Sequence, residues 1–138
     1  MSAQENVQIV KGVYAAFGRG DLQGLLAMFA EDIEWITPGE GLPWAGTYRG
    51  HAAVADFFQK LSELVEFSAV EPREFVAEGD RVLVVGFGRG RLKPTNRTLE
   101  GHWVMAYTVR NGRVTNVREY NDTLAAARAF EMVASAST

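Results

Sequence analysis

The sequence contains no cysteine, and it has only two histidines, His51 and His102, among 138 residues. The absence of cysteine excludes disulfide bonds, thiolate metal sites and a cysteine nucleophile. Two histidines far apart in the sequence disfavour a structural zinc site, which needs clustered nitrogen and sulfur ligands. We therefore expect a protein that works without a metal ion or another cofactor.

The sequence also lacks an excess of positive charge and any long apolar run. Its 14 Lys and Arg residues against 17 Asp and Glu give a formal net charge of −3, and no basic stripe suggests nucleic acid. No apolar segment approaches the roughly 20 residues that span a bilayer, and the first residues do not resemble a secretory signal. These features predict a cytoplasmic protein that binds neither nucleic acid nor membrane.

The residues that are present are those of an ordinary globular protein. Hydrophobic residues make up 47% of the chain and charged residues 22%. The length suits one domain with one core, and no repeat or linker divides it. We therefore expect a single domain over residues 1–138.

Three helices are predicted in the first half of the chain. Ser2 and Glu5 have the spacing of a capping box, so a helix is expected to begin there. Gly18-Arg19-Gly20 should end it, because glycine readily adopts the left-handed conformation at a helix end. Asp21 can cap a second helix. Apolar residues at a period of 3.6 predict a third helix over residues 51–65.

A loop rich in glycine and proline is predicted over residues 37–50, after a short strand over 33–36. Trp44 lies within this loop and Trp35 just before it. A loop of this length is either a lid over a site or plain surface. The two tryptophans favour the lid.

The second half of the chain is predicted to be rich in strands. Residues 67–77 form one strand, in which Pro72 indicates an edge position or a bulge, and residues 81–91 form the next. Two long strands then meet at Asn111-Gly112, the pair most typical of a tight hairpin turn. A short helix over residues 123–134 ends the chain. Helices followed by a meander of strands indicate an α+β fold.

The hairpin over residues 97–122 carries an unusual polar face. Side chains alternate along a strand, so Arg118, Tyr120 and Asp122 share one face. His102 lies on the corresponding face of the first strand, opposite Trp103. A polar strand face either meets water or lines a polar pocket, and we interpret it as a pocket.

The apolar faces of two strands are interpreted as an outer surface, on which we predict a homodimer. Their residues are Trp103, Met105, Tyr107 and Val109 on one strand and Leu83, Val85 and Phe87 on its neighbour. These faces could instead be the inner ones, which would invert the site. On the strand over 81–91, Gly86, Gly88 and Gly90 alternate with those apolar residues, and we expect Gly86 and Gly88 to form a bare cavity wall.

Three segments of the chain resemble one known superfamily. They are VYAAFGRGDLQGLLAMFAEDIEW at residues 13–35, the glycines and tyrosine at 38–50, and NGRVTNVREYNDT at 111–123. The chain resembles the nuclear-transport-factor-2-like superfamily, and within it the SnoaL-like, polyketide cyclase-like group related to ketosteroid isomerases. The resemblance implies a cystatin-like α+β barrel, a cone-shaped, curved mixed sheet wrapped around the N-terminal helices. It also implies an internal ligand cavity and dimers formed through the outer sheet face.

The resemblance to ketosteroid isomerases places a hydrogen-bonding tyrosine at Tyr14. It places the catalytic base at Thr37 and the second acid near Val104, where this chain has no acid. Two of three roles are therefore empty, which makes steroid-type isomerisation unlikely to be the activity of this chain.

The resemblance to limonene epoxide hydrolases and SnoaL-like cyclases points to Asp122. The hydrolase triad would need two further residues where this chain has Gly86 and Gly88, so that triad is broken. In the cyclases a single aspartate at the end of the last strand is the general acid/base, and this role transfers to Asp122. Asp122 also precedes the terminal helix, where aspartate is a preferred N-cap.

The expected site thus has Asp122 and His102 as catalytic residues. The expected ligand-binding residues are Tyr14, Phe17, Trp35, Trp44, Gly86, Gly88, Arg118 and Tyr120. One hypothesis is a cofactor-independent acid/base enzyme, of isomerase, cyclase or hydrolase type, for a small, largely apolar or carbonyl-containing molecule. The other is a binding or accessory protein without turnover, which needs cavity shape but no converging polar groups.

Overall fold

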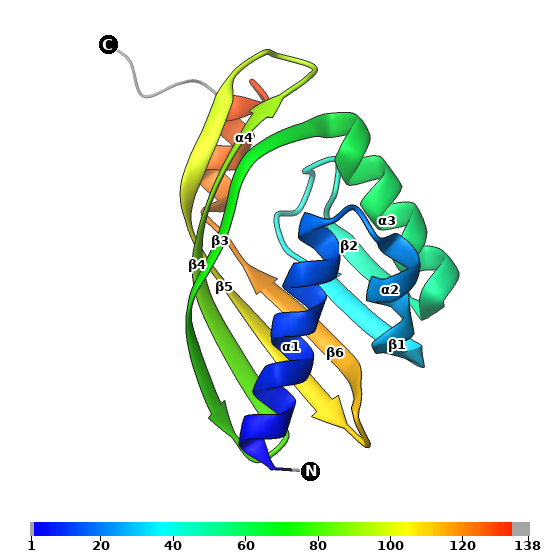
Figure 1. Ribbon diagram of the computed structural model, residues 1–138. Coiled ribbons are helices and arrows are strands. Elements are labelled where there is room, and N and C mark those ends of the chain that lie inside the picture. Colours follow the sequence, from blue (N-terminus) through cyan, green and yellow to red (C-terminus); the bar gives the residue numbers. More distant parts are fainter. Residues whose placement is uncertain (1, 134–138) are drawn as a thin grey trace.

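The computed structural model describes residues 2–133, in which a curved six-stranded sheet wraps around helices (Figure 1). The elements in chain order are α1 (Ala3–Gly18), α2 (Leu22–Ala27), β1 (Phe29–Thr37), β2 (Gly46–Arg49), α3 (Gly50–Leu64), β3 (Val65–Glu78), β4 (Arg81–Leu92), β5 (Thr98–Arg110), β6 (Arg113–Tyr120) and α4 (Thr123–Ala129). The strand order is β2-β1-β6-β5-β4-β3. Strands β1 and β6 are parallel and the other neighbours antiparallel, so the sheet is mixed. The predicted α+β cone is confirmed.

The predicted helix starts are those of the structure. The Ser2 hydroxyl accepts a hydrogen bond from the Glu5 amide, and the Glu5 carboxylate accepts one from the Ser2 amide, which completes the capping box. Gly20 has a φ of 68°, the left-handed conformation expected after α1. The Asp21 carboxylate caps α2 through the Gly24 amide. Local sequence therefore sets these boundaries.

Two predicted element bounds differ from the structure. Strand β1 is longer than predicted, because it pairs with β2 on one side and β6 on the other. Strand β2 itself lies within the predicted loop of residues 37–50. Helix α4 ends at Ala129, and residue 134, the predicted end of this helix, lies outside the described residues.

The central hairpin has the predicted turn and one unpredicted bulge. Asn111 and Gly112 have φ values of 52° and 78°, as this turn requires. Thr108 pairs with Asn116 whereas Val109 pairs with Val114, so Thr115 is an extra residue in β6. Pro72 lies in edge strand β3 beside a register shift, as predicted.

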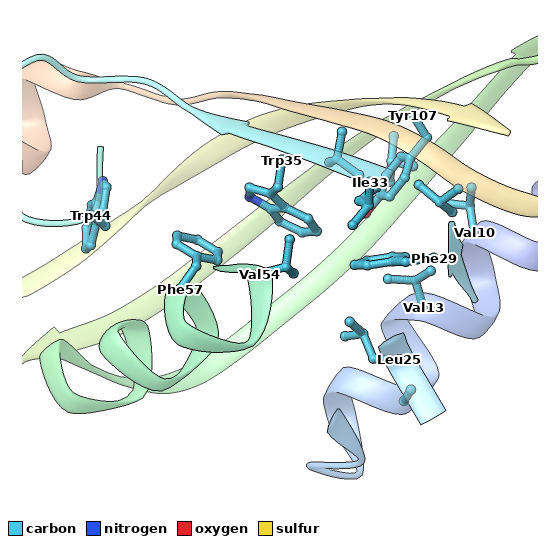
Figure 2. Packing of buried hydrophobic residues seen from close by; sticks show 14 of the residues in the cluster. Val10, Val13, Leu25, Phe29, Ile33, Trp35, Trp44, Val54, Phe57 and Tyr107 are labelled. Atoms are coloured by element: carbon cyan, nitrogen blue, oxygen red, sulfur yellow. The ribbon is translucent and has the colours of Figure 1, made fainter. Parts of the chain in front are cut away.

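The main core lies between the concave face of the sheet and helices α1, α2 and α3 (Figure 1). In Figure 2, Trp35 of β1 faces Phe57 of α3, and their ring centroids are 5.6 Å apart. Phe29 is fully buried and contacts the Trp35 ring at 5.9 Å. None of the helices in residues 2–133 is both long and apolar enough to cross a membrane.

Candidate functional site

A cavity of about 210 Å³ lies between the concave face of the sheet and the helices. Its lining is mostly apolar and rich in aromatic rings. The aromatic residues of the lining are Tyr14, Phe17, Trp35, Trp44, Phe57, Phe58, Phe67, Trp103 and Tyr107. A cavity of about 150 Å³ with an apolar lining admits benzene, so this one has room for more than a single ring.

Glu119 of β6 is the carboxyl group inside this cavity. Its register partner is Met105 of β5, which also lines the cavity. Thr37, at the end of the parallel neighbour β1, is buried, and its hydroxyl donates a hydrogen bond to Glu119 Oε2. Glu119 is therefore a half-buried residue that borders the cavity and is held at one carboxylate oxygen by a hydroxyl of the neighbouring strand.

Burial raises the pKa of Glu119 to about 7, from an ordinary value of 4.5. The Thr37 hydroxyl, which donates to Glu119 Oε2, and the nearby polar side chains of Asn121 and Trp35 favour the ionised form and oppose the effect of burial. The Trp35 indole Nε1 is buried and has no hydrogen-bond partner in the described part of the chain. A carboxyl group with this pKa can both accept and donate a proton near neutral pH.

Two tyrosines lie close to Glu119. Burial raises the pKa of Tyr14 and of Tyr107 well above the ordinary range, and the charge of Glu119 adds to both effects. The Tyr14 hydroxyl is 3.1 Å from Met105 Sδ, a weak acceptor, so its proton is available to a stronger one. The Tyr14 ring stacks on Trp103, with centroids 5.8 Å apart. Tyr14 is thus a neutral donor at the same end of the cavity as Glu119.

The face of the β5–β6 hairpin that was predicted to line the cavity is the outer face in the structure, and the predicted outer face is the inner one. Arg118 is exposed and Tyr120 is 53% exposed on the outer face of the sheet, so neither lines the cavity as predicted. The predicted outer residues Trp103, Met105 and Tyr107 line the cavity instead. The physical reason is burial, because the more apolar face of β5 gains more free energy from contact with α1 than the polar face would.

The two residues predicted to be catalytic, His102 and Asp122, border the cavity, but their side chains make other contacts. His102 borders the cavity, but its side chain is exposed and its ring packs on Phe87, with centroids 5.5 Å apart. Asp122 also borders the cavity, and its carboxylate accepts a hydrogen bond from the Ala125 amide at 2.9 Å. Asp122 is thus the N-cap of α4, the structural role that the sequence left open.

Gly86 and Gly88 were predicted to form a bare wall of the cavity, but the Trp103 side chain occupies most of the space beside them. A Cβ atom on Gly86 would lie 2.3 Å from the Trp103 ring, and one on Gly88 would lie 3.2 Å from Trp103 Nε1. Gly86 is therefore absent from the cavity lining, contrary to the prediction, whereas Gly88 contributes to it. The side chain of the neighbouring strand takes most of the space that the sequence suggested was empty.

The other predicted lining residues do line the cavity. They are Tyr14, Phe17, Trp35 and Trp44. Trp44 is 9% exposed and packs edge-on against Phe130 at 5.1 Å, which anchors the loop between β1 and β2 beside the cavity. Within residues 2–133 no group of three carboxylate or imidazole side chains is placed to hold a metal ion.

Glu119 was missed by the sequence reasoning, because the sequence indicates the inner face of the first strand of the hairpin but not the register of the second. The most apolar face of the hairpin, with Trp103, Met105 and Tyr107, is the better candidate for the inside. Even so, a two-residue turn alone would pair Tyr107 with Asn116 and turn Glu119 outward. The Thr115 bulge shifts the register so that Tyr107 pairs with Val117, which brings Glu119 inward.

Comparisons with known proteins agree on the family. The profile of the SnoaL-like domain matches residues 10–117. The crystal structure of an NTF2-like protein from Burkholderia xenovorans LB400 has a TM-score of 0.87 and 67% sequence identity, covering 94% of this chain and 98% of that one. TerC, co-crystallised with polyporic acid, has a TM-score of 0.83 and 28% identity, with 92% and 98% covered.

A relative in Mycobacterium tuberculosis, strain H37Rv, is named only as an uncharacterized protein. It is 28% identical over 130 residues, which cover 94% of this chain and 98% of the relative. The profile match spans most of the sequence, and the solved structures share the curved sheet that holds the cavity. This chain belongs to the SnoaL-like domain family, with the NTF2-like fold.

Proposed function

We propose that the protein binds a small, largely apolar carbonyl compound in the cavity and that Glu119 moves a proton on it. The observation that carries this proposal is a carboxyl group with a pKa of about 7 inside an aromatic cavity. A general acid/base works best when its pKa lies near the working pH. The raised pKa and the cavity position support a role that a surface carboxylate could not fill.

Two neighbours give Glu119 a setting suited to this chemistry. Thr37 donates to Oε2 of the carboxylate, and we assign the uptake of a proton from carbon to the other oxygen. Tyr14, kept neutral by its raised pKa, can donate to a carbonyl oxygen as negative charge develops on it. In related isomerases the position of Thr37 carries the base itself. We infer that β6 supplies the carboxyl group here and β1 supplies its partner.

The ligand class follows from the cavity and from one relative. The lining offers aromatic rings with few polar groups, which favours a flat, ring-containing molecule. TerC, at 28% identity, was co-crystallised with polyporic acid. We infer an enolisable ketone or a related hydroxylated ring compound as the ligand of this chain.

We also propose that the protein forms a homodimer through the outer face of the sheet. After the correction of the faces, the apolar residues of that surface include Leu83, Val85, Phe87, Val104 and Tyr120. Leu83 is 39% exposed and Tyr120 is 53% exposed, which is unfavourable in water. Arg89 of β4 and Glu100 of β5 form an exposed ion pair within the chain, so charged side chains lie beside these apolar ones.

The experiment that tests the catalytic proposal measures proton exchange on a ketone. 4-Phenylcyclohexanone has acidic protons beside its carbonyl group, and their replacement by deuterium in D₂O can be followed by proton NMR. Wild-type protein should accelerate the exchange. Glu119→Gln should lose on the order of 10²–10⁴ in rate, because it keeps the size and the Thr37 contact of Glu119 but carries no proton.

Two further variants make this test specific. Glu63→Gln, on the exposed surface of α3, is the matched control and should keep the wild-type rate. Asp122→Asn keeps the helix cap and removes a second carboxylate that borders the cavity. A loss in Asp122→Asn with Glu119→Gln active would assign the proton transfer to Asp122. Tight ketone binding without any exchange would indicate a binding protein.

A further inference from the structure

Gly101 of β5 lines the cavity but lacks the packing constraint found at the three glycines of β4. Cβ atoms on Gly86, Gly88 and Gly90 would lie 2.3 Å, 3.2 Å and 2.6 Å from the nearest atoms. A Cβ atom on Gly101 would meet nothing within 4 Å. Packing therefore explains the glycines of β4 but not Gly101.

Backbone conformation does not require glycine at position 101 either. Gly101 lies within the regular pairing of β4 and β5, directly opposite Gly88, and it is absent from the residues with positive φ. A glycine inside a strand weakens it, because it adds backbone entropy to the unfolded chain and no side chain to the fold. Neither packing nor conformation thus accounts for the missing side chain.

The open space at Gly101 belongs to the cavity. Gly101 alternates with Leu99 and Trp103, and all three line it. Glu119 pairs with Met105, so Gly101 lies four residues along β5 from that level, or about 13 Å at 3.3 Å per residue. The cavity therefore extends from the carboxyl group, past Trp103, to Gly101.

The surroundings of Gly101 are apolar and aromatic. Val70 pairs with Gly88, and Phe67 pairs with Gly90, and both side chains line the cavity. The Phe67 and Phe17 rings meet edge to face with centroids 5.9 Å apart. We call this end of the cavity, formed by Gly88, Gly101, Phe17, Phe67 and Val70, the distal subsite.

We propose that Gly101 determines ligand length: its missing side chain leaves the distal subsite open to the second ring of an elongated ketone whose carbonyl group lies at Glu119. This inference rests on the proposed function and adds to it the length of the ligand. A one-ring ketone reaches only the Glu119 end and Trp103. A two-ring ketone of linear shape also covers the bare backbone of Gly101.

The test compares two ketones by isothermal titration calorimetry, cyclohexanone with one ring and 4-phenylcyclohexanone with two rings in line. Gly101→Leu should weaken the binding of 4-phenylcyclohexanone by at least about 10-fold, since its side chain occupies the distal subsite. The same variant should bind cyclohexanone as the wild type does. Gly101→Ala should fall between the wild type and Gly101→Leu.

Two control variants separate ligand exclusion from damage to the strand. Thr98→Leu places the same side chain on β5 at an exposed position outside the cavity, and it should bind both ketones normally. Gly86→Ala should lower the thermal unfolding midpoint, because its Cβ would clash with Trp103. Gly101→Ala should keep the wild-type midpoint.

The possible results distinguish this inference from the proposed function. If Gly101→Leu binds 4-phenylcyclohexanone as tightly as the wild type, the role of Gly101 is wrong and the proposed function stands. If Gly101→Ala lowers the midpoint as Gly86→Ala does, the glycine serves the backbone and the inference is overturned. If neither ketone binds to the wild type, both proposals are wrong.

Discussion

Glu119 combines a cost in folding free energy with a capacity for chemistry. Burial raises its pKa to about 7, although the hydrogen-bonding groups of Thr37, Asn121 and Trp35 partly compensate. A carboxyl group that serves only structure would be replaced at little cost by an apolar residue of similar size. Its position beside an aromatic cavity fits the proposed proton transfer, and its raised pKa has a measurable consequence for stability.

The stability of the protein is expected to fall as the pH rises from about 4.5 to about 7. In this range the folded state holds the Glu119 proton and the unfolded state has released it, so rising pH favours unfolding. The raised pKa corresponds to at most on the order of 3 kcal/mol, at about 1.36 kcal/mol per pKa unit. Denaturant unfolding of wild type and Glu119→Gln at about pH 5 and about pH 8 measures this contribution.

Glu119→Gln should be more stable than the wild type above pH 7, and this advantage should shrink toward pH 5. The difference between the two proteins isolates Glu119, because all other titrating groups are common to both. An advantage that is the same at both pH values would show that Glu119 has an ordinary pKa. The acid/base role would then lose its main support.

At the scale of elements, the end of β6 serves two purposes. Strand β6 carries Glu119 to the cavity, and three residues later Asp122 caps α4, which closes that end through Ala126. Thr115 aligns the strand, because its bulge turns Glu119 inward. The short segment over residues 115–122 therefore positions both the site and helix α4: Thr115 sets the register, Glu119 borders the cavity and Asp122 caps the helix.

Asp122 is expected to contribute to stability chiefly as a helix cap. Asp122→Ala should lower the free energy of unfolding by about 1 kcal/mol, whereas Asp122→Asn should leave it nearly unchanged, because asparagine caps equally well. Denaturant unfolding at neutral pH measures both variants. An equal loss in both would mean that the charge of Asp122 matters more than its hydrogen bond to Ala125.

At the scale of the whole molecule, the two faces of the sheet have different tasks. The concave face, with helices α1, α2 and α3, encloses the core and the cavity (Figure 1). Within residues 2–133 the convex face carries apolar side chains among charged ones, whereas α1, α2 and α3 all lie on the concave side (Figure 1). The predicted dimer remains a proposal. Its proposed interface includes Leu83, Val85 and Phe87 but not Trp103, because Trp103 lines the cavity on the other face.

Light scattering at micromolar concentration should give the mass of a dimer. Leu83→Lys should shift the protein toward the monomer, because it places a charge among apolar side chains of the proposed interface. The control is Leu124→Lys on α4, because Leu124 is also an exposed leucine, 51% exposed against 39% for Leu83, but does not lie on these strands. A wild-type monomer, or equal behaviour of the two variants, would contradict the proposed interface.

The features that depend only on neighbouring residues could be predicted from the sequence. The capping box at Ser2 and Glu5, the cap at Asp21 and the turn at Asn111-Gly112 each follow from local hydrogen bonds or backbone preference. The order of helices and strands, together with the family resemblance, was enough to predict the curved mixed sheet. Tyr14 and Trp35, two of the residues expected to bind the ligand, line the cavity, and their role in binding stays a prediction.

Only the tertiary structure decided which face of the hairpin is inside and which carboxyl group lies in the cavity. A strand has side chains on two faces, and a one-residue change in register exchanges the partners of every later residue. The bulge at Thr115 makes that change, and no local pattern in the sequence marks it. The glycines of β4 likewise gain their meaning only from Trp103, whose ring comes from the neighbouring strand and fills the space beside them.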